Sequence, residues 1–298
     1  MRRISLALFF LLFSLLLRSA VAQTGLTFLQ LGVTAREQAM ANVGVASATG
    51  AAANYYNPAL LNSSEKSGIL FSQSLWLLDT YSSYAATAFN YGQSALGFSL
   101  TWLTVNDIPI RMRPTESPEG TFAAQNLALS ASYAYSFSNR FTLALTSKFL
   151  YERIFIDDAT GLAFDLSGLY ALSSDFRLAA ALQNLGGMNA LSSETSRLPT
   201  LLRAGAAYLL ALSSLESRLL LEANVVAVFS DATVFNLGAE FEFRDLFWAR
   251  AGLTLGQASR TLSAGIGVKW SSFKLDYAFV PFSDQLGSAN IFTVQFHY

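Results

Sequence analysis

The chain has 298 residues, of which 52% are apolar and only 13% are charged, and its formal net charge is −1. A soluble domain carries about a quarter charged residues, so this composition disfavours an ordinary cytosolic enzyme. A nucleic-acid-binding protein usually has an excess of basic residues, which a net charge near zero does not provide. The absence of cysteine excludes disulfides and thiol chemistry. With one histidine, His297, we expect no metal site, no cofactor and no enzyme.

Residues 1–22 have the three parts of a secretory signal peptide. Arg2 and Arg3 are basic, residues 4–17 are apolar, and Ala20-Val21-Ala22 is a cleavage signal. An apolar run of 14 residues is too short to span a membrane as a helix. The sequence therefore predicts an exported bacterial protein whose mature chain begins at Gln23.

Residues 23–66 are rich in small side chains and lack the alternation of the rest of the chain. The pattern allows a short helix over 34–42. Asn57-Pro58 fits either a simple turn before the first strand or a part in ligand gating, and both interpretations stay open.

From residue 67 onward, apolar and polar residues alternate with period two, which indicates strands with two different faces. Most of these segments have the length of about 9–11 residues that a tilted membrane strand needs. The fourteen predicted strands are 67–78, 82–91, 94–105, 122–137, 141–154, 161–172, 176–184, 200–212, 216–229, 233–243, 247–255, 261–270, 273–281 and 288–298.

Loop lengths alternate along the chain. The connections after even-numbered strands are tiny, whereas those after odd-numbered strands include 106–121, 155–160 and 185–199. Transmembrane barrels have short periplasmic turns and longer outer loops, so the alternation predicts an even strand count and a periplasmic C-terminus. The longest outer connection, 106–121, is short for a protein-docking platform.

Charged residues in the later strands all fall on the register opposite the apolar one, as expected if they face the lumen and avoid lipid. They number six basic and six acidic residues, so the lumen lacks the single-sign ring of an ion-selective pore. Balanced charges predict salt-bridged packing around a plug that Arg36 joins. The twelve are Lys148, Glu152, Asp165, Arg177, Arg203, Glu222, Glu240, Glu242, Arg250, Lys269, Lys274 and Asp276.

The last predicted strand ends in alternating large residues, Phe292, Val294, Phe296 and Tyr298. An amphipathic strand with a terminal aromatic residue resembles the assembly signal that the barrel-insertion machinery of the outer membrane recognises. His297 falls on the polar register, which ranks an outer-membrane phospholipase, with its lipid-facing Ser-His pair, last among the candidate functions.

Two regions carry a family resemblance. Gly32 to Arg36 match a G-x-x-A-R stretch and Asn57-Pro58-Ala59 match an N-P-A before the first strand. Near the C-terminus, Asp276 to Phe279, followed by Pro281 and Leu286-Gly287, resemble a D-Y-A-F hairpin. This pattern resembles the PorV/PorQ family of the FadL-like outer-membrane superfamily, which implies a fourteen-stranded barrel with an N-terminal hatch in its lumen.

The sequence thus predicts an all-β, fourteen-stranded antiparallel barrel in the bacterial outer membrane. Residues 1–22 are expected to be the signal peptide, 23–66 the hatch inside the barrel, and 67–298 the barrel itself. The expected hatch and lumen residues are Arg36, Asn57, Pro58, Lys148, Asp165, Arg203, Glu222, Glu240, Arg250 and Asp276.

The resemblance implies two functions. One is an accessory or cargo-handling role in type IX protein secretion, with secreted proteins or secretion components as partners. The alternative is FadL-like passive transport of hydrophobic small molecules. In both cases outer-membrane lipid and the barrel-insertion machinery are expected partners, and nucleic acid is not.

Overall fold

A closed antiparallel β-barrel of fourteen strands forms the body of the molecule. The structure, a computed structural model, describes residues 25–63, 67–111, 113–114, 116–192, 194–229 and 231–297. The expected signal peptide and Tyr298 lie outside these residues. The barrel strands are β1 (Gly68–Leu75), β2 (Thr80–Tyr91), β3 (Ser94–Ile110), β4 (Gly120–Ser138), β5 (Phe141–Ile154), β6 (Asp157–Ala171), β7 (Phe176–Met188), β10 (Leu201–Leu212), β11 (Ser217–Val228), β12 (Thr233–Phe243), β13 (Phe247–Leu255), β14 (Leu262–Trp270), β15 (Phe273–Pro281) and β16 (Ser288–His297).

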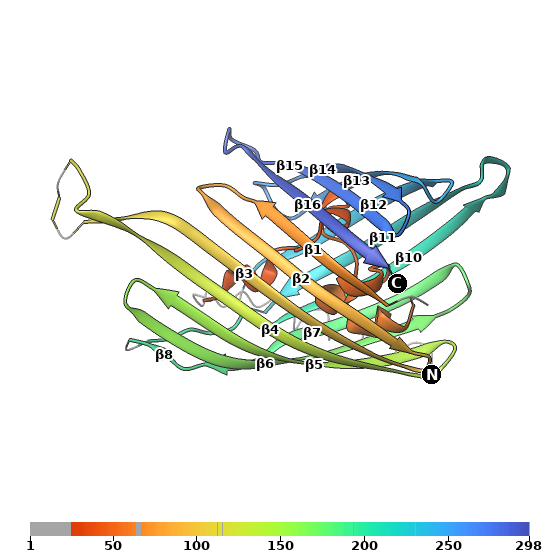
Figure 1. The fold of residues 1–298 in the computed structure, drawn as a ribbon, viewed down its shortest axis with the longest axis horizontal. Helices are drawn as coiled ribbons and strands as arrows, with labels where there is room; N and C mark the ends of the chain where they lie inside the picture. The colour runs from red at the N-terminus through yellow and green to blue at the C-terminus, as the bar shows by residue number, and fades with distance from the viewer. Residues whose placement is uncertain are drawn as a thin grey trace, which may run out of the picture.

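Each strand pairs with its neighbour in sequence, and β1 pairs with β16 to close the barrel (Figure 1). The predicted fold and strand count are therefore confirmed. Two short strands, β8 (Ala190–Leu191) and β9 (Glu194–Thr195), form a separate hairpin in the connection between β7 and β10. Among the described residues, no helix is both long enough and apolar enough to cross a membrane.

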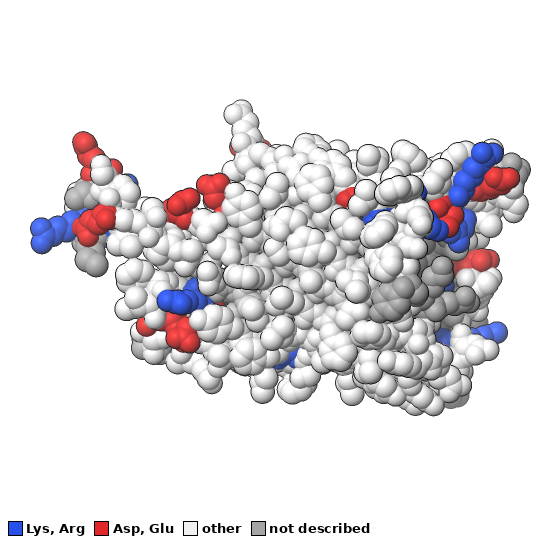
Figure 2. All heavy atoms as spheres, viewed as in Figure 1, with Lys and Arg blue, Asp and Glu red and all other residues white. Residues whose placement is uncertain are grey.

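Alternation along the strands places apolar side chains outside and small or polar ones inside. In β1, which has no charge to assign its faces, Ile69 and Phe71 point outward, whereas Leu70 and Ser72 are buried. Figure 2 shows Lys, Arg, Asp and Glu gathered toward the two ends of the visible face, and a broad region between them that mostly lacks charge. Because a charge facing lipid is costly, this region is the part that lies in the membrane.

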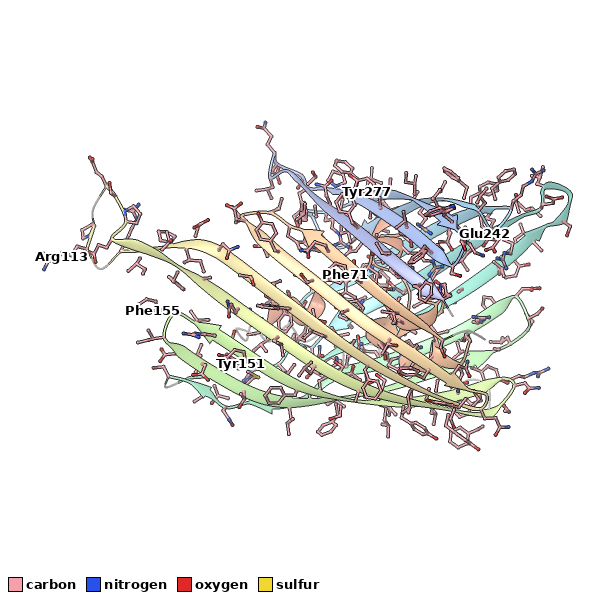
Figure 3. All side chains as sticks on the ribbon, in the orientation of Figure 1. Phe71, Arg113, Tyr151, Phe155, Glu242 and Tyr277 are labelled. Atoms are coloured by element: carbon pink, nitrogen blue, oxygen red, sulfur yellow. The ribbon has the colours of Figure 1, made fainter. Side chains whose placement is uncertain are left out.

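The hairpin of β3 and β4 is longer than predicted. Its strands pair as far as Ile110 and Gly120, past an irregularity between Val105 and Ile108, so the expected loop 106–121 shrinks to 111–119. Asp107, at the irregularity, has a positive φ of 53°. The hairpin projects beyond its neighbours (Figure 1), and Arg113 lies at its tip (Figure 3). Proline at 109 masked the strand. Pairing of β3 with β2 ends at Val105, so beyond it β3 pairs only with β4, and its open side tolerates a proline.

Residues 25–63 form the described part of the hatch. They fold into short helical turns: η1 (Thr27–Gln30), α2 (Ala35–Ala39), η2 (Gly50–Ala52), α3 (Ala53–Tyr56) and η3 (Pro58–Ser63). The predicted helix over 34–42 is shorter than expected, because Ala41 and Asn42 take positive φ values of 59° and 62° that end it.

The hatch touches the inner surface of the barrel on opposite sides. Helix α2 contacts β13, β14, β15 and β16, whereas η3 contacts β2 to β6. In Figure 1 these turns lie between the front and rear walls. The backbone N–H of Gly25 donates to the carbonyl of Arg197, in the outer connection before β10. The side chain of Asn62 donates to the carbonyl of Gln93, in the short turn after β2. The segment therefore runs through the lumen from its outer half to its periplasmic end.

Candidate functional site

Arg36 of the hatch is the centre of a buried ion network. Its Nε and Nη2 donate to both carboxylate oxygens of Glu240 on β12, at 2.9 and 2.8 Å. Its Nη1 pairs with Glu37 at 2.9 Å and also donates to the carbonyl of Ser47. A bidentate guanidinium–carboxylate pair is among the strongest and most directional contacts in proteins, so it fixes both the position and the orientation of α2.

The barrel wall completes this network. Arg250 on β13 contacts Glu240 at 2.5 Å and Asp276 on β15 at 2.8 Å. Lys274 lies within electrostatic range of Asp276 and Glu240 and stacks over Trp248 at 3.9 Å. Three cations, Arg36, Arg250 and Lys274, thus balance three carboxylates, Glu37, Glu240 and Asp276. The sum is neutral, which a buried cluster needs.

Wall hydroxyl groups satisfy the two ends of α2, which lacks side-chain caps of its own. Thr293 accepts the N–H of Ala35 at 2.8 Å. Ser263 donates to the carbonyl of Ala39 at 3.0 Å and accepts the N–H of Ala41 at 2.9 Å. Since a helix end leaves unpaired backbone groups, this five-residue helix depends on the barrel for its hydrogen bonds.

Glu222 on β11 holds the next part of the hatch. One carboxylate oxygen accepts the N–H groups of Gly44 and Ala46, at 2.9 and 3.0 Å. The side chain is 3% exposed, and no ion pair joins it to a cation in the described part of the chain. The Glu222 carboxylate therefore binds backbone N–H groups of the hatch rather than neutralising a charged side chain.

A row of glycines on the inner face of the wall lets the hatch lie against the strands. Gly205, Gly238, Gly252 and Gly265 occupy inward positions on β10, β12, β13 and β14. A methyl group at Gly238 would lie 2.6 Å from Val43, and one at Gly265 would lie 2.5 Å from Ala39. Sequence reasoning missed this row, whose signal is glycine at lumen-facing positions of four strands that lie close together in the wall.

The other side of the hatch packs by apolar contact. Tyr56, Ala59, Leu60 and Leu61 are buried in one cluster with Leu70, Tyr84 and inward alanines of the strands. Asn57 donates to the carbonyls of Val45 and Gly168, at 2.8 and 3.2 Å, and accepts the N–H of Ala59 across Pro58. In the structure, Asn57-Pro58 therefore forms a buried turn that ties the hatch to β6.

Lys148 and Asp165 belong to a separate group on β5 to β7. Lys148 pairs with Asp165 at 2.7 Å and donates to Asn184 at 2.8 Å. Asp165 also accepts the backbone N–H of Asn184, whose φ is 63°. These bonds fasten an irregular position of the wall, and Arg36 does not take part in them.

Arg203 on β10 lies beneath α3. It donates to Gln183 at 2.9 Å, and its guanidinium lies 5.7 Å from the ring centre of Tyr55 and 6.0 Å from that of Tyr56. Burial raises the pKa of Tyr55 to about 12, so its hydroxyl keeps the proton that it donates to the carbonyls of Leu29 and Leu31.

The expected assembly signal lies on the outer face of β16. Phe292 and Val294 are exposed to the membrane, and Phe296 stacks with Phe273 at 5.0 Å. His297 packs near Gly68 at the periplasmic end of the lumen. Within the described residues, no group of three or more His, Asp and Glu side chains is placed to hold a metal ion.

Comparison with known proteins identifies one family. The model of the type IX secretion system protein PorV matches residues 17–218, which include the hatch and strands β1 to β10. No curated protein matches the chain.

Solved structures share the fold at low sequence identity. The CymD monoaromatic hydrocarbon channel has a TM-score of 0.61 and 13% identity over 92% of this chain and 98% of its own. The Pseudomonas putida toluene transporter TodX has a TM-score of 0.62 and 12% identity over 89% and 98%. A Pseudomonas aeruginosa FadL homologue has a TM-score of 0.53 and 11% identity over 89% and 98%.

Proposed function

Because the chain belongs to the PorV family of type IX secretion system proteins, we propose that it is an accessory of type IX secretion that does not itself conduct cargo. It resides in the bacterial outer membrane as a FadL-like barrel. In this role it would bind secretion components or receive secreted proteins at the membrane.

The observation that carries this proposal is the filled lumen. The hatch is fastened to β12 by Arg36, to β11 by Glu222 and to β6 by Asn57. Wide barrels are either open channels or plugged, and a plugged barrel of this width leaves no path for a polypeptide. An accessory that works through its surface fits this arrangement better than a conduit.

The β3–β4 hairpin is the surface we propose for contact with a protein partner. It is the longest pairing in the barrel, and its outer part carries Asp107, Arg111, Arg113, Glu116 and Glu119. The tip presents both signs of charge (Figure 2), which favours selective docking over non-specific attraction.

The test is secretion in a bacterium that encodes the other type IX components and proteins with their C-terminal sorting domain. Deleting the gene should abolish or reduce surface delivery of those proteins, and the intact gene should restore it. A variant lacking residues 108–122 should insert normally but fail to restore delivery. Normal secretion in the deletion strain would refute the accessory role.

The second candidate is passage of small molecules, as in the hydrocarbon channels that share the fold. Two cavities favour it, because they approach the hatch from opposite ends. One, of about 400 Å³, is lined by Asn42 and Arg203, and the other, of about 210 Å³, by Arg36 and Glu240. Moving the hatch would join them.

Planar bilayers separate the two candidates. The intact protein should be nearly silent under the accessory proposal, and deleting residues 24–62 should leave an inserted barrel that conducts steadily. If the intact protein already conducts or takes up toluene into vesicles, small-molecule transport becomes the better interpretation. If the deletion abolishes insertion, the hatch is needed for assembly.

A further inference from the structure

A cavity in the outer half of the lumen has a composition unlike the rest of the interior. It holds about 400 Å³ between η1, the hatch residue Asn42 and the walls of β10 to β12. Residues of two outer loops, including Asp231 and Arg260, form its rim. A volume of this size suits a small organic molecule, and it opens toward the cell exterior.

Arg203 reaches this cavity from the wall. The residue is only 1% exposed, and it uses Nε to bond Gln183 while Nη1 has no hydrogen-bond partner. No carboxylate pairs with Arg203 in the described part of the chain. A buried guanidinium without an anion is costly, so the site is chemically incomplete.

Arg260 adds a second cation from the loop between β13 and β14. Its Nε is shielded from solvent and unbonded, and none of the ion pairs among the described residues includes it. Burial lowers the pKa of Arg260, and repulsion from Arg203 acts in the same direction. Two arginines thus share one chamber with a single carboxylate, Asp231 at the rim, and no ion pair among the described residues joins that carboxylate to either of them. The Arg36 network below the chamber is neutral.

The other walls indicate the kind of anion. Leu31, Val226, Val228 and Val234 supply apolar surface, and Asp231 at the rim already accepts the N–H of Ala232. A guanidinium binds a carboxylate with two parallel hydrogen bonds. Apolar walls beside such a group favour a short hydrocarbon body over an inorganic ion, which would leave those walls in contact with water.

We propose that this chamber, lined by Arg203 and Arg260, is a binding site for a small organic carboxylate that enters from the cell exterior. The carboxylate lies between the two guanidinium groups, and its aliphatic part lies against Val226, Val228 and Leu31. This inference does not depend on the role in secretion, since it concerns a pocket above the hatch and not the hairpin.

Calorimetric titration of the mature full-length protein in a nonionic detergent tests the site. The probe is sodium pentanoate in low-salt buffer at neutral pH, with pentanamide and sodium chloride as matched titrants. Pentanoate should bind at one site per chain, and pentanamide, which keeps the size but lacks the charge, should bind at least about tenfold more weakly. Sodium chloride should not compete at equal concentration.

Two variants and a control locate the binding. Arg260→Gln lies in a loop and should fold normally while weakening pentanoate binding at least about tenfold. Arg203→Gln should do the same, provided that its migration on a gel still changes with heating. Arg218→Gln, which removes an exposed cation from the periplasmic end, should leave affinity unchanged.

Three results would overturn the proposal. They are the absence of pentanoate binding to the intact protein, equal binding of pentanamide, and unchanged affinity in Arg260→Gln. Saturation by chloride alone would show that the chamber needs only an inorganic counter-ion, and it would likewise refute the organic ligand.

Discussion

The hatch meets the barrel in two different ways. Toward β11 to β15 it is held by ion pairs, carboxylate-to-backbone bonds and wall hydroxyls, over a floor of glycines. Toward β2 to β6 it buries alanine, leucine and tyrosine side chains with few directional bonds. The first side specifies one position, because ion pairs and hydrogen bonds depend steeply on geometry. On the second side, burial of apolar surface stabilises the hatch but depends little on its exact position, because the hydrophobic effect is not directional.

The difference can be measured because the chain contains no cysteine. Ser47→Cys places one thiol on the ionic side, and Ala59→Cys places one on the apolar side; both residues are buried. The rate of maleimide labelling then reports local opening of each side. If the two rates always rise together, the hatch opens as one body and the comparison fails.

The largest expected effect follows from Glu240→Gln. This change removes the carboxylate shared by Arg36 and Arg250 and leaves three buried cations against two carboxylates, at a cost of about 3–5 kcal/mol. Labelling at Ser47→Cys should accelerate at least about 100-fold, and the Ala59→Cys rate should change less. Glu216→Gln, which breaks the exposed pair with Arg244, serves as the control and should change neither rate.

Leu60→Ala tests the apolar side. Leu60 is fully buried against the wall, so its truncation should cost about 2–5 kcal/mol through lost transfer energy and a cavity. The Ala59→Cys rate should rise most. The exposed Leu78 offers the matched control, and Leu78→Ala should leave labelling unchanged. Faster labelling at Ser47→Cys alone would contradict the division into two sides.

Gly238→Ala tests the glycine floor. The added methyl group would meet Val43 and the Met40 carbonyl within 2.8 Å, and overpacking of this kind costs about 1–3 kcal/mol. The hatch should open more often on the ionic side while the barrel remains inserted. Gly187→Ala, where nothing lies within 4 Å of the new atom, should have no such effect.

Asn57→Ala has an expected cost similar to that of Gly238→Ala, and it tests the junction between the sides. The change removes the bonds to Val45 and Gly168 and the turn across Pro58. We expect a loss of about 1–3 kcal/mol, because two carbonyls lose their partner. Both labelling rates should rise by similar factors. A rise at only one site would show that Asn57 does not couple the two sides.

The wall of the barrel was predictable because period two repeats over fourteen strands, each flanked by a turn. The twelve lumen charges were likewise readable from register, and all are buried or partly buried in the structure. The pairing of Arg36 with Glu240 was not readable, since 204 positions separate them and the hatch has no period. The end of α2 was missed because alanine rarely adopts the positive φ that Ala41 has in the structure.

The extended β3–β4 hairpin sets a distance as well as a contact. From Val105 to Ile110 the strand adds roughly 17 Å beyond the regular pairing, and backbone bonds to β4 keep it from collapsing onto the membrane. A partner bound at the tip would therefore be held at a fixed distance from the lipid surface. The register shift between Val105 and Ile108, where Asp107 has a positive φ, sets the angle at which the outer part of the hairpin leaves the barrel.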